Sequence, residues 1–406
     1  MLRQSPILVA LVALASIGAI LPASVLAQCP SFLTQWGSSG SDIGHFDSPL
    51  GVATDAAGNV LVADTENYRI QKFTGAGTFL TQWGSEGSGN GQFYPRGVAI
   101  DAAGNVFVAD GANDRIQKFN GAGTYLTQWG SPGSGAGQLS GPTGVAADAS
   151  GNIYVAESSN HRIQKFTGEG VYLAQWGSQG SGNGQFNYPE GVATDAAGNV
   201  YVADQWNHRI QKFTGAGAYL TQWGSLGGSD GQFREPGGVA IDTAGNVNVA
   251  DYNNHRIQKF TSAGAYICKL FGVSNGFIQP IGVATDRAGN VFVVDVSLDR
   301  IVKFGPAPAV SVPDGIRTRV LELEAVRPNP SRGKRLHVAF TLPASASARL
   351  ELLDVSGRCV GTREVSSMGA GHHVLDFAED GVRPGLYFLR LTQGTSAAVR
   401  PVVVLN

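Results

Sequence analysis

A unit of about 47 residues is repeated along most of this sequence. Each copy reads Gly-Val-Ala, Asp, Gly-Asn, Val-Ala-Asp and Arg-Ile-Gln-Lys-Phe, or close variants, and the sixth copy is the most divergent. The copies begin at Gly51, Gly97, Gly144, Gly191, Gly238 and Gly282, which are spaced 46, 47, 47, 47 and 44 residues apart. A fixed period of roughly 40 to 50 residues that is rich in short strands is typical of a β-propeller.

Each copy divides into four predicted strands. In the copy that begins at Gly191, alternating or β-branched segments cover 191–195, 200–204, 209–213 and 219–224, and Gly-containing turns separate them. No fourth strand follows Phe304, but residues 32–37 near the N-terminus have the sequence of a fourth strand. We therefore expect an all-β chain: a six-bladed β-propeller closed by an N-terminal strand, followed by a small C-terminal β-sandwich.

The composition excludes several classes of function. Of the 406 residues, 43% are hydrophobic, 15% are charged and 56 are glycine, and the glycines fall at fixed turn positions of the repeat. The formal net charge is −2, so no global field favours nucleic acid or an anionic membrane. The three cysteines, Cys29, Cys268 and Cys359, form neither a metal-site spacing nor a disulfide framework, and a Cys29–Cys268 pair stays an open alternative.

The N-terminus has the organisation of a secretory signal peptide. Arg3 supplies the positive charge, residues 7–21 form the apolar run, and Val25-Leu26-Ala27 fits a cleavage site before Gln28. We expect no transmembrane span after cleavage, because the apolar run is short. Lipidation at Cys29 is the alternative, but Gln28 stands where a lipobox has a small residue.

The predicted domains follow from where the repeat stops. Residues 1–27 are the signal peptide, 28–304 the propeller, 305–318 a Pro-rich linker, and 319–406 an immunoglobulin-like β-sandwich. Alternating segments at 336–342, 348–355, 373–377, 386–391 and 399–405 predict five to seven strands in the last domain.

The repeat resembles the NHL repeat. Gly-Val-Ala-x-Asp, Gly-Asn-Val-x-Val-Ala-Asp and Asn-His-Arg-Ile-Gln-Lys-Phe carry the resemblance over residues 32–304, with the Asn-His-Arg motif intact at 207–209 and 254–256. The copies depart from the pattern at three positions. Tyr68, Asp114 and Asp299 replace the histidine, Glu157 replaces the strand-end Asp, and Leu298 replaces the asparagine in the sixth copy.

The C-terminal segment resembles the C-terminal sorting domain of type IX (Por) secretion substrates. Arg327–Pro330, Phe340–Pro343, Leu350–Arg358, Gly371-His372 and Pro384–Tyr387 carry this resemblance, and the immunoglobulin-like module of the flagellar hook-cap protein is similar too. The first resemblance implies that secretion machinery is a partner and that the chain is secreted or lies on the outer cell surface. A plain immunoglobulin-like spacer is the alternative.

Residues that recur in every copy are predicted to be structural. His161, His208 and His255 lie in successive blades, too far apart to converge on one metal ion. An acidic residue and an arginine recur together, and a charge-assisted pair that braces the loop between the second and third strands explains them. The pairs are Asp64 with Arg69, Asp110 with Arg115, Glu157 with Arg162, Asp204 with Arg209, Asp251 with Arg256, and Asp295 with Arg300.

Function is expected at positions where the copies differ. The residues before the repeated glycines form a predicted ring at the channel mouth: Leu50, Arg96, Thr143, Glu190, Gly237 and Ile281. Together with the loop aromatics Trp206 and Tyr252, Arg96 and Glu190 are the candidate ligand contacts, because binding surfaces favour exposed aromatics and arginine. No catalytic residue and no metal ligand is predicted. The Asp-x-x-Gly-Asn turns suggest calcium only weakly, because they carry few carboxylates.

These features favour a secreted or surface binding protein that recognises a protein, peptide or glycan with its loop-rich face. Related six-bladed lyases and lactonases carry histidines or carboxylates with a metal at the channel mouth, whereas the ring here holds one cation, one anion and no histidine. A metal-dependent lyase or lactonase-like hydrolase is the alternative function. RNA binding, which the NHL resemblance also implies, conflicts with the net charge and the predicted export.

Overall fold

A computed structural model describes residues 29–272 and 276–306 of the repeat region, and 321–323, 331–332, 335–343, 346–365, 368–369, 371–378, 382–394 and 396–405 of the C-terminal region. The chain divides into two compact units, one ending at Ala309 and one beginning at Val310. The predicted signal peptide, most of the predicted linker and the Arg327–Pro330 motif lie outside the described residues.

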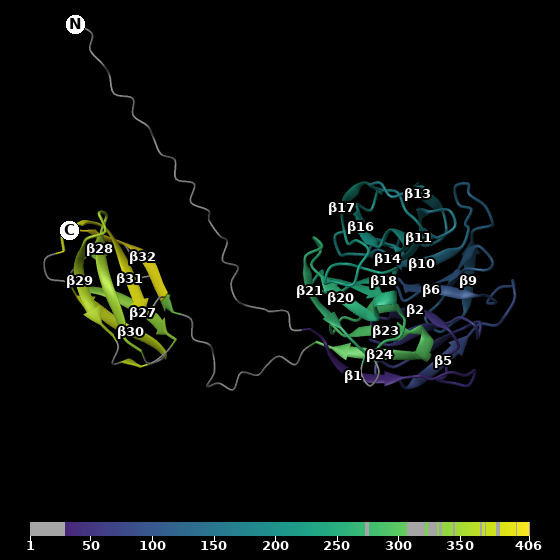
Figure 1. The fold of residues 1–406 in the computed structure, drawn as a ribbon, viewed down its shortest axis with the longest axis horizontal. Helices are drawn as coiled ribbons and strands as arrows, with labels where there is room; N and C mark the ends of the chain where they lie inside the picture. The colour runs from purple at the N-terminus through teal and green to yellow at the C-terminus, as the bar shows by residue number, and fades with distance from the viewer. Residues whose placement is uncertain are drawn as a thin grey trace, which may run out of the picture. The chain divides into compact units, whose positions relative to one another are not determined.

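The first unit contains six antiparallel sheets of four strands each (Figure 1). The first strands are β2 (Pro49–Thr54), β6 (Pro95–Ile100), β10 (Pro142–Ala147), β14 (Pro189–Thr194), β18 (Pro236–Ile241) and β22 (Pro280–Thr285). The second strands are β3 (Val60–Asp64), β7 (Val106–Asp110), β11 (Ile153–Glu157), β15 (Val200–Asp204), β19 (Val247–Asp251) and β23 (Val291–Asp295). The third strands are β4 (Arg69–Phe73), β8 (Arg115–Phe119), β12 (Arg162–Phe166), β16 (Arg209–Phe213), β20 (Arg256–Phe260) and β24 (Arg300–Gly305).

The fourth strands come from two places in the sequence. Five follow their own third strands: β5 (Phe79–Trp83), β9 (Tyr125–Trp129), β13 (Tyr172–Trp176), β17 (Tyr219–Trp223) and β21 (Tyr266–Leu270). The sixth is β1 (Ser31–Trp36), which pairs antiparallel with β24 and so joins the two ends of this unit in one sheet.

The first strands lie close together around the middle of the unit. Each contacts the first strand of the next sheet, and β22 contacts β2. The repeated glycine explains this close approach, since a Cβ at Gly97 would lie 2.3 Å from the carbonyl oxygen of Thr143 in the next sheet. The glycine that opens each copy is therefore required by the contact between neighbouring first strands.

Hydrophobic packing occurs between neighbouring sheets. One cluster joins Leu61 and Ile70 of the first sheet to Phe93, Val98 and Val106 of the second, and all five side chains are buried. Equivalent clusters lie between the other sheets. Each sheet thus buries its two faces against its neighbours, which is the packing expected for a stacked repeat.

Cys29 and Cys268 form a disulfide with a Cα–Cα distance of 6.0 Å. Cys29 precedes β1, and Cys268 lies in β21 of the fifth sheet, so the bond fixes the N-terminal strand to the sheet beside the one that it completes. This answers the question that the sequence left open. The sulfur that the lipid alternative requires is engaged in this bond.

The second unit has eight described strands in two sheets that share one core. One sheet contains β25 (Glu322–Leu323), β27 (Arg335–Leu342) and β30 (Gly371–Ala378). The other contains β26 (Ser331–Arg332), β32 (Ser396–Leu405), β31 (Gly385–Gln393), β28 (Ala348–Asp354) and β29 (Cys359–Glu364). The expectation of five to seven strands was too low, because two strands are only two residues long and β29 is rich in polar residues.

Candidate ligand-binding face

Each sheet of the first unit holds a buried ion pair at the end of its second strand. The carboxylate side chains are fully buried, and the pairs measure 2.7 Å at Asp64–Arg69, 2.8 Å at Asp110–Arg115, 2.7 Å at Glu157–Arg162, Asp204–Arg209 and Asp251–Arg256, and 2.9 Å at Asp295–Arg300. The structure thus places all six pairs where the sequence put them.

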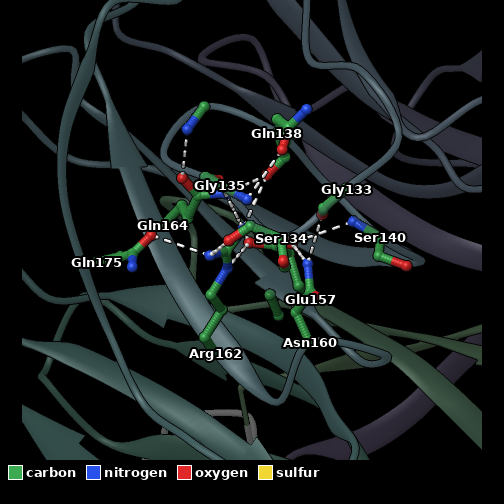
Figure 2. Close-up of polar contacts among 12 residues, drawn as sticks. Gly133, Ser134, Gly135, Gln138, Ser140, Glu157, Asn160, Arg162, Gln164 and Gln175 are labelled. Carbon is green, nitrogen blue, oxygen red and sulfur yellow. Dashed lines mark hydrogen bonds and ion pairs between the residues drawn. The ribbon is translucent and has the colours of Figure 1, made fainter.

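The ion pair holds more than the loop between the second and third strands. Figure 2 shows Arg162 donating hydrogen bonds to the backbone carbonyls of Ser134, Gly135 and Gln138, in the loop that enters the third sheet. Glu157 accepts from the backbone N–H of Ser140 at 3.0 Å. Since buried polar groups are costly unless they are paired, this network fixes the Gly/Ser-rich loop.

A buried glutamine completes this network, and sequence reasoning missed it. Gln164 donates to the carbonyl of Gln138 at 2.6 Å and to Glu157 at 2.7 Å, while its amide oxygen accepts from the backbone of Gly137 at 2.9 Å. The repeated Arg-Ile-Gln-Lys-Phe motif carried the signal, since its glutamine points into the sheet junction in five copies. We call the acidic residue, the arginine and this glutamine the loop clamp.

The residue at the histidine position links neighbouring sheets. His161 Nδ1 accepts a hydrogen bond from the backbone N–H of Tyr188 at 3.1 Å, and His208 does the same for Glu235 at 3.1 Å. Asp114 and Asp299 replace histidine and accept from Gly141 and Ser48 at 2.8 and 2.9 Å. These side chains are therefore spacers between sheets, and burial lowers the pKa of His161, which must be unprotonated at Nδ1 to accept.

The variable ring converges on one cavity at the mouth of the channel between the first strands. Leu50, Arg96, Thr143, Glu190 and Ile281 line this cavity, together with the backbones of the repeated glycines. Gly237, the sixth expected member, is not among the lining residues, although Gly238 is. The cavity has a volume of about 80 Å³, which suffices for a small group of a larger ligand.

Arg96 and Glu190 meet in this cavity, although β6 and β14 are separated by β10. The guanidinium Nη2 of Arg96 lies 3.6 Å from Oε1 of Glu190, and the two side chains are 34% and 16% exposed. Burial raises the pKa of Glu190, and the charge of Arg96 partly offsets this rise. The mouth of the channel thus carries a partly buried, overall neutral charge pair.

The neighbourhood of Arg96 is adapted to this side chain. Gly111 stands where the other copies have Thr65, Ser158, Gln205, Tyr252 or Val296. A Cβ at Gly111 would lie 2.5 Å from Cδ of Arg96, so a side chain at this position would displace the arginine. Copy two therefore changes two positions together, which the sequence showed but sequence reasoning did not connect.

Trp206 lies outside the cavity lining, on the same loop-rich side of its sheet. It belongs to the short 3₁₀ helix η1 (Gln205–Asn207), where a plain loop was expected, and its side chain is 56% exposed. Its ring packs on Tyr188 with centroids 5.3 Å apart and planes tilted by 32°, and Tyr188 in turn contacts His161 at 5.0 Å. Sequence reasoning missed Tyr188, although Tyr-Pro-Arg at 94–96 and Tyr-Pro-Glu at 188–190 occur only in copies two and four.

Tyr252 also lies outside the lining of the cavity. It begins η2 (Tyr252–Asn254) and is half-buried. Burial and then the charge of Glu235 raise the pKa of its hydroxyl. Tyr94 is held by a hydrogen bond from its hydroxyl to Glu66, and burial together with this bond raises its pKa to about 12.

The opposite end of the channel is lined by Asp55, Asp101, Asp242 and Asp286, which belong to the Asp-x-x-Gly-Asn turns. Their oxygens are used within the turns, as where Asp101 accepts from the backbone of Ala103 and Asn105 at 2.9 and 2.8 Å. Within the described ranges, no three His, Cys, Asp or Glu side chains are grouped so that they hold a metal ion.

Comparison with family models agrees with this geometry. The NHL repeat model matches residues 46–73, 94–119, 139–166, 186–213 and 233–260. The chain therefore contains NHL repeats, and the five matches fall on the first five copies. A second model, for a secretion system C-terminal sorting domain, matches residues 325–405, and this domain indicates export and an interaction with secretion machinery. No helix among the described residues is long and apolar enough to cross a membrane.

Solved structures that resemble the NHL-repeat chain show propeller-like folds. A protein of unknown function from Bacteroides thetaiotaomicron aligns with a TM-score of 0.54 and 19% identity, over 67% of this chain and 76% of its own. A streptogramin B lyase aligns with a TM-score of 0.51 and 14% identity, over 69% of this chain and 99% of its own. The gluconolactonase XC5397 from Xanthomonas campestris aligns with a TM-score of 0.50 and 14% identity, over 68% of this chain and 97% of its own. At these identities the likeness concerns the fold alone. No curated protein matches the chain.

Proposed function

We propose that this protein is secreted or displayed on the outer cell surface and binds a protein, peptide or glycan with its loop-rich face. The six sheets act as the blades of one closed propeller, which is supported by the contacts of the first strands and by the pairing of β1 with β24. The C-terminal unit acts as an immunoglobulin-like sandwich that directs type IX export. The shared core of its two sheets supports the sandwich, and the match to the sorting-domain model supports the export role.

One observation carries the proposal: Arg96 and Glu190, from sheets that are not neighbours, meet in one cavity on the loop-rich face. Ligand sites are concave and mostly apolar, with a few polar groups that fix orientation. The cavity has this composition, since Leu50, Ile281 and glycine backbones surround the charge pair. The loop clamps support the face from below, which keeps its geometry fixed before a ligand arrives.

The test uses the full chain on an array of glycans and peptides. We expect a ligand to bind the parent protein, and an Arg96→Gln, Trp206→Ala double variant to bind at least about tenfold more weakly, as for residues that dominate an interface. Thr243→Ala is the matched control, because Thr243 lies at the other end of the channel and is exposed. A ligand that binds both variants equally would show that another surface is used.

One feature favours the alternative of a lyase or lactonase-like hydrolase. A partly buried carboxyl group with a raised pKa beside an arginine suits general acid catalysis, and such groups cluster at active sites. The binding proposal expects no turnover of lactones by the purified protein, with or without added calcium or zinc. Turnover that is abolished in Glu190→Gln would replace the binding proposal with the enzymatic one.

A further inference from the structure

The charge pair at the channel mouth lacks hydrogen bonds within the described part of the chain. The 3.6 Å between Arg96 Nη2 and Glu190 Oε1 exceeds the length of a normal hydrogen bond. The buried Nε of Arg96 has no acceptor among the described residues. Buried donors and charged acceptors are costly when they are left without hydrogen bonds, so this pair is suited to a ligand that supplies both.

From this pair, we propose that the cavity binds a neutral carbohydrate through two neighbouring hydroxyl groups. The inference rests on the proposed binding function and deepens it. Each hydroxyl is both donor and acceptor, so one diol can accept from the Arg96 fork and donate to Glu190. A ligand with a net charge gains less, because the pair is neutral as a whole and Thr143, Leu50 and Ile281 add no charge.

A peptide backbone fits this pair less well than a diol does. A trans peptide group directs its N–H and C=O in opposite directions within one plane, so a single group cannot donate to Glu190 and accept from Arg96 at once. The cavity at the channel mouth is also small, with a volume of about 80 Å³, so it admits the edge of one sugar ring better than a peptide chain with its side chains. These two points favour the glycan over the peptide.

The aromatic pair beside the cavity supplies a second contact of the kind that a sugar ring uses. Trp206 and Tyr188 are 56% and 41% exposed, and their rings stack on each other at a tilt of 32°, so the exposed parts of this stacked pair offer aromatic surface to a ligand. The negative face of an aromatic ring attracts the slightly positive C–H groups of a pyranose. Tyr188 stands two residues before Glu190, so their Cα atoms lie at most about 7 Å apart. We expect successive units of one oligosaccharide to reach both side chains.

This aromatic surface is fixed before the ligand binds. Tyr188 has a φ of 54°, in the left-handed region, and the following Pro189 restricts the backbone further. The hydrogen bond from its N–H to His161 and the edge contact with the same imidazole hold the ring in place. An ordered platform lowers the entropy lost on binding.

The test measures retardation of the full chain in native gels that contain soluble neutral polysaccharides: a β-glucan, xylan, mannan and starch. Hexasaccharides of the retarding polymer are then titrated by calorimetry. We expect at least one polymer to bind. Trp206→Ala, Glu190→Gln and Gly111→Ser should each weaken binding about tenfold or more, the last because its side chain displaces Arg96 without changing any charge.

Leu220→Ala is the matched control, because Leu220 is a similarly exposed apolar residue on β17 of the same sheet as Trp206, within an outer strand. It should bind as the parent does. Binding that all three variants retain would overturn the proposal. If no glycan binds but a peptide does, and its binding depends on Trp206 and Glu190 in the same way, the assignment of a carbohydrate ligand is wrong and the proposed binding function stands. Lactone turnover without binding of either would contradict the binding function itself.

Discussion

The loop clamps and the channel mouth differ in how each uses charge. In the clamps, a carboxylate, an arginine and usually a glutamine recur in every sheet, are buried and have hydrogen bonds to nearly all their polar atoms. At the mouth, Arg96 and Glu190 occur once, and their side chains are partly exposed and have no hydrogen bonds to the described residues. Charge that is satisfied by the fold stabilises the fold, whereas charge that is left underused is available to a ligand.

Breaking one clamp should produce the largest effect. Glu157→Ala leaves Arg162 buried without its partner, which costs about 3–5 kcal/mol of the free energy of unfolding. Urea denaturation monitored by fluorescence measures the change. Lys269→Ala is the control, because Lys269 pairs with Asp230 and their side chains are 37% and 44% exposed, and exposed pairs contribute at most about 1 kcal/mol. Equal losses in the two variants would contradict the role of the clamp.

The disulfide tests whether the first unit depends on its joined ends as well as on its clamps. Cys268→Ser removes the bond between the N-terminal segment and the fifth sheet, and losses of about 2–4 kcal/mol are typical for a disulfide. We expect a lower melting temperature in calorimetry, and the parent protein should match the variant after reduction. Cys359→Ser, at the exposed free cysteine, should melt as the parent does. An unchanged melting temperature in Cys268→Ser would show that the sheet pairing of β1 suffices.

The histidine spacer should have a smaller effect that depends on pH. Neutral His161 accepts from Tyr188, and its pKa is lowered by burial, so the unfolded chain binds the proton more tightly. The stabilisation is therefore present above the unfolded pKa near 6.5 and is lost as the pH falls through the folded value. His161→Ala should cost about 1 kcal/mol at pH 8 and less at pH 5.

His161→Asp is the conservative variant for this position, because Asp114 and Asp299 accept the equivalent bond in other sheets. It should retain most of the stability at pH 8 and lose the histidine-dependent change between pH 8 and pH 5. A loss as large as that of the alanine variant would mean that the contact of the imidazole with Tyr188, and not the hydrogen bond, stabilises the sheets.

The clamps and five of the six ring residues at the mouth were predictable from sequence, but the contacts that the mouth residues make were not, for a physical reason. Repetition exposed Asp64–Arg69 and its equivalents, because a local interaction required in every sheet leaves the same residues at the same spacing. The repeat places Arg96 and Glu190 in one ring, but their contact across an intervening sheet depends on how far the two side chains reach, which no spacing rule indicates. The Gly111 substitution and the Tyr188 platform were visible as departures from the repeat, but their meaning depended on which side chains meet in space.

Glu190→Gln should change the free energy of unfolding in the opposite direction from the clamp variants. Because burial raises the pKa of Glu190 despite the neighbouring Arg96, the folded state holds a proton more tightly than the unfolded state does. The charged carboxylate therefore costs stability as the pH rises through the folded pKa, and the neutral glutamine avoids this cost. We expect a small gain in the free energy of unfolding at pH 7 that disappears below the unfolded pKa, near 4.5.

Denaturant titrations at pH 7 and pH 4 measure this gain, with Glu235→Gln as a control on the same face. A gain in stability together with weaker ligand binding is the result expected of a residue kept for binding, whereas a loss of stability at pH 7 would place Glu190 with the clamps.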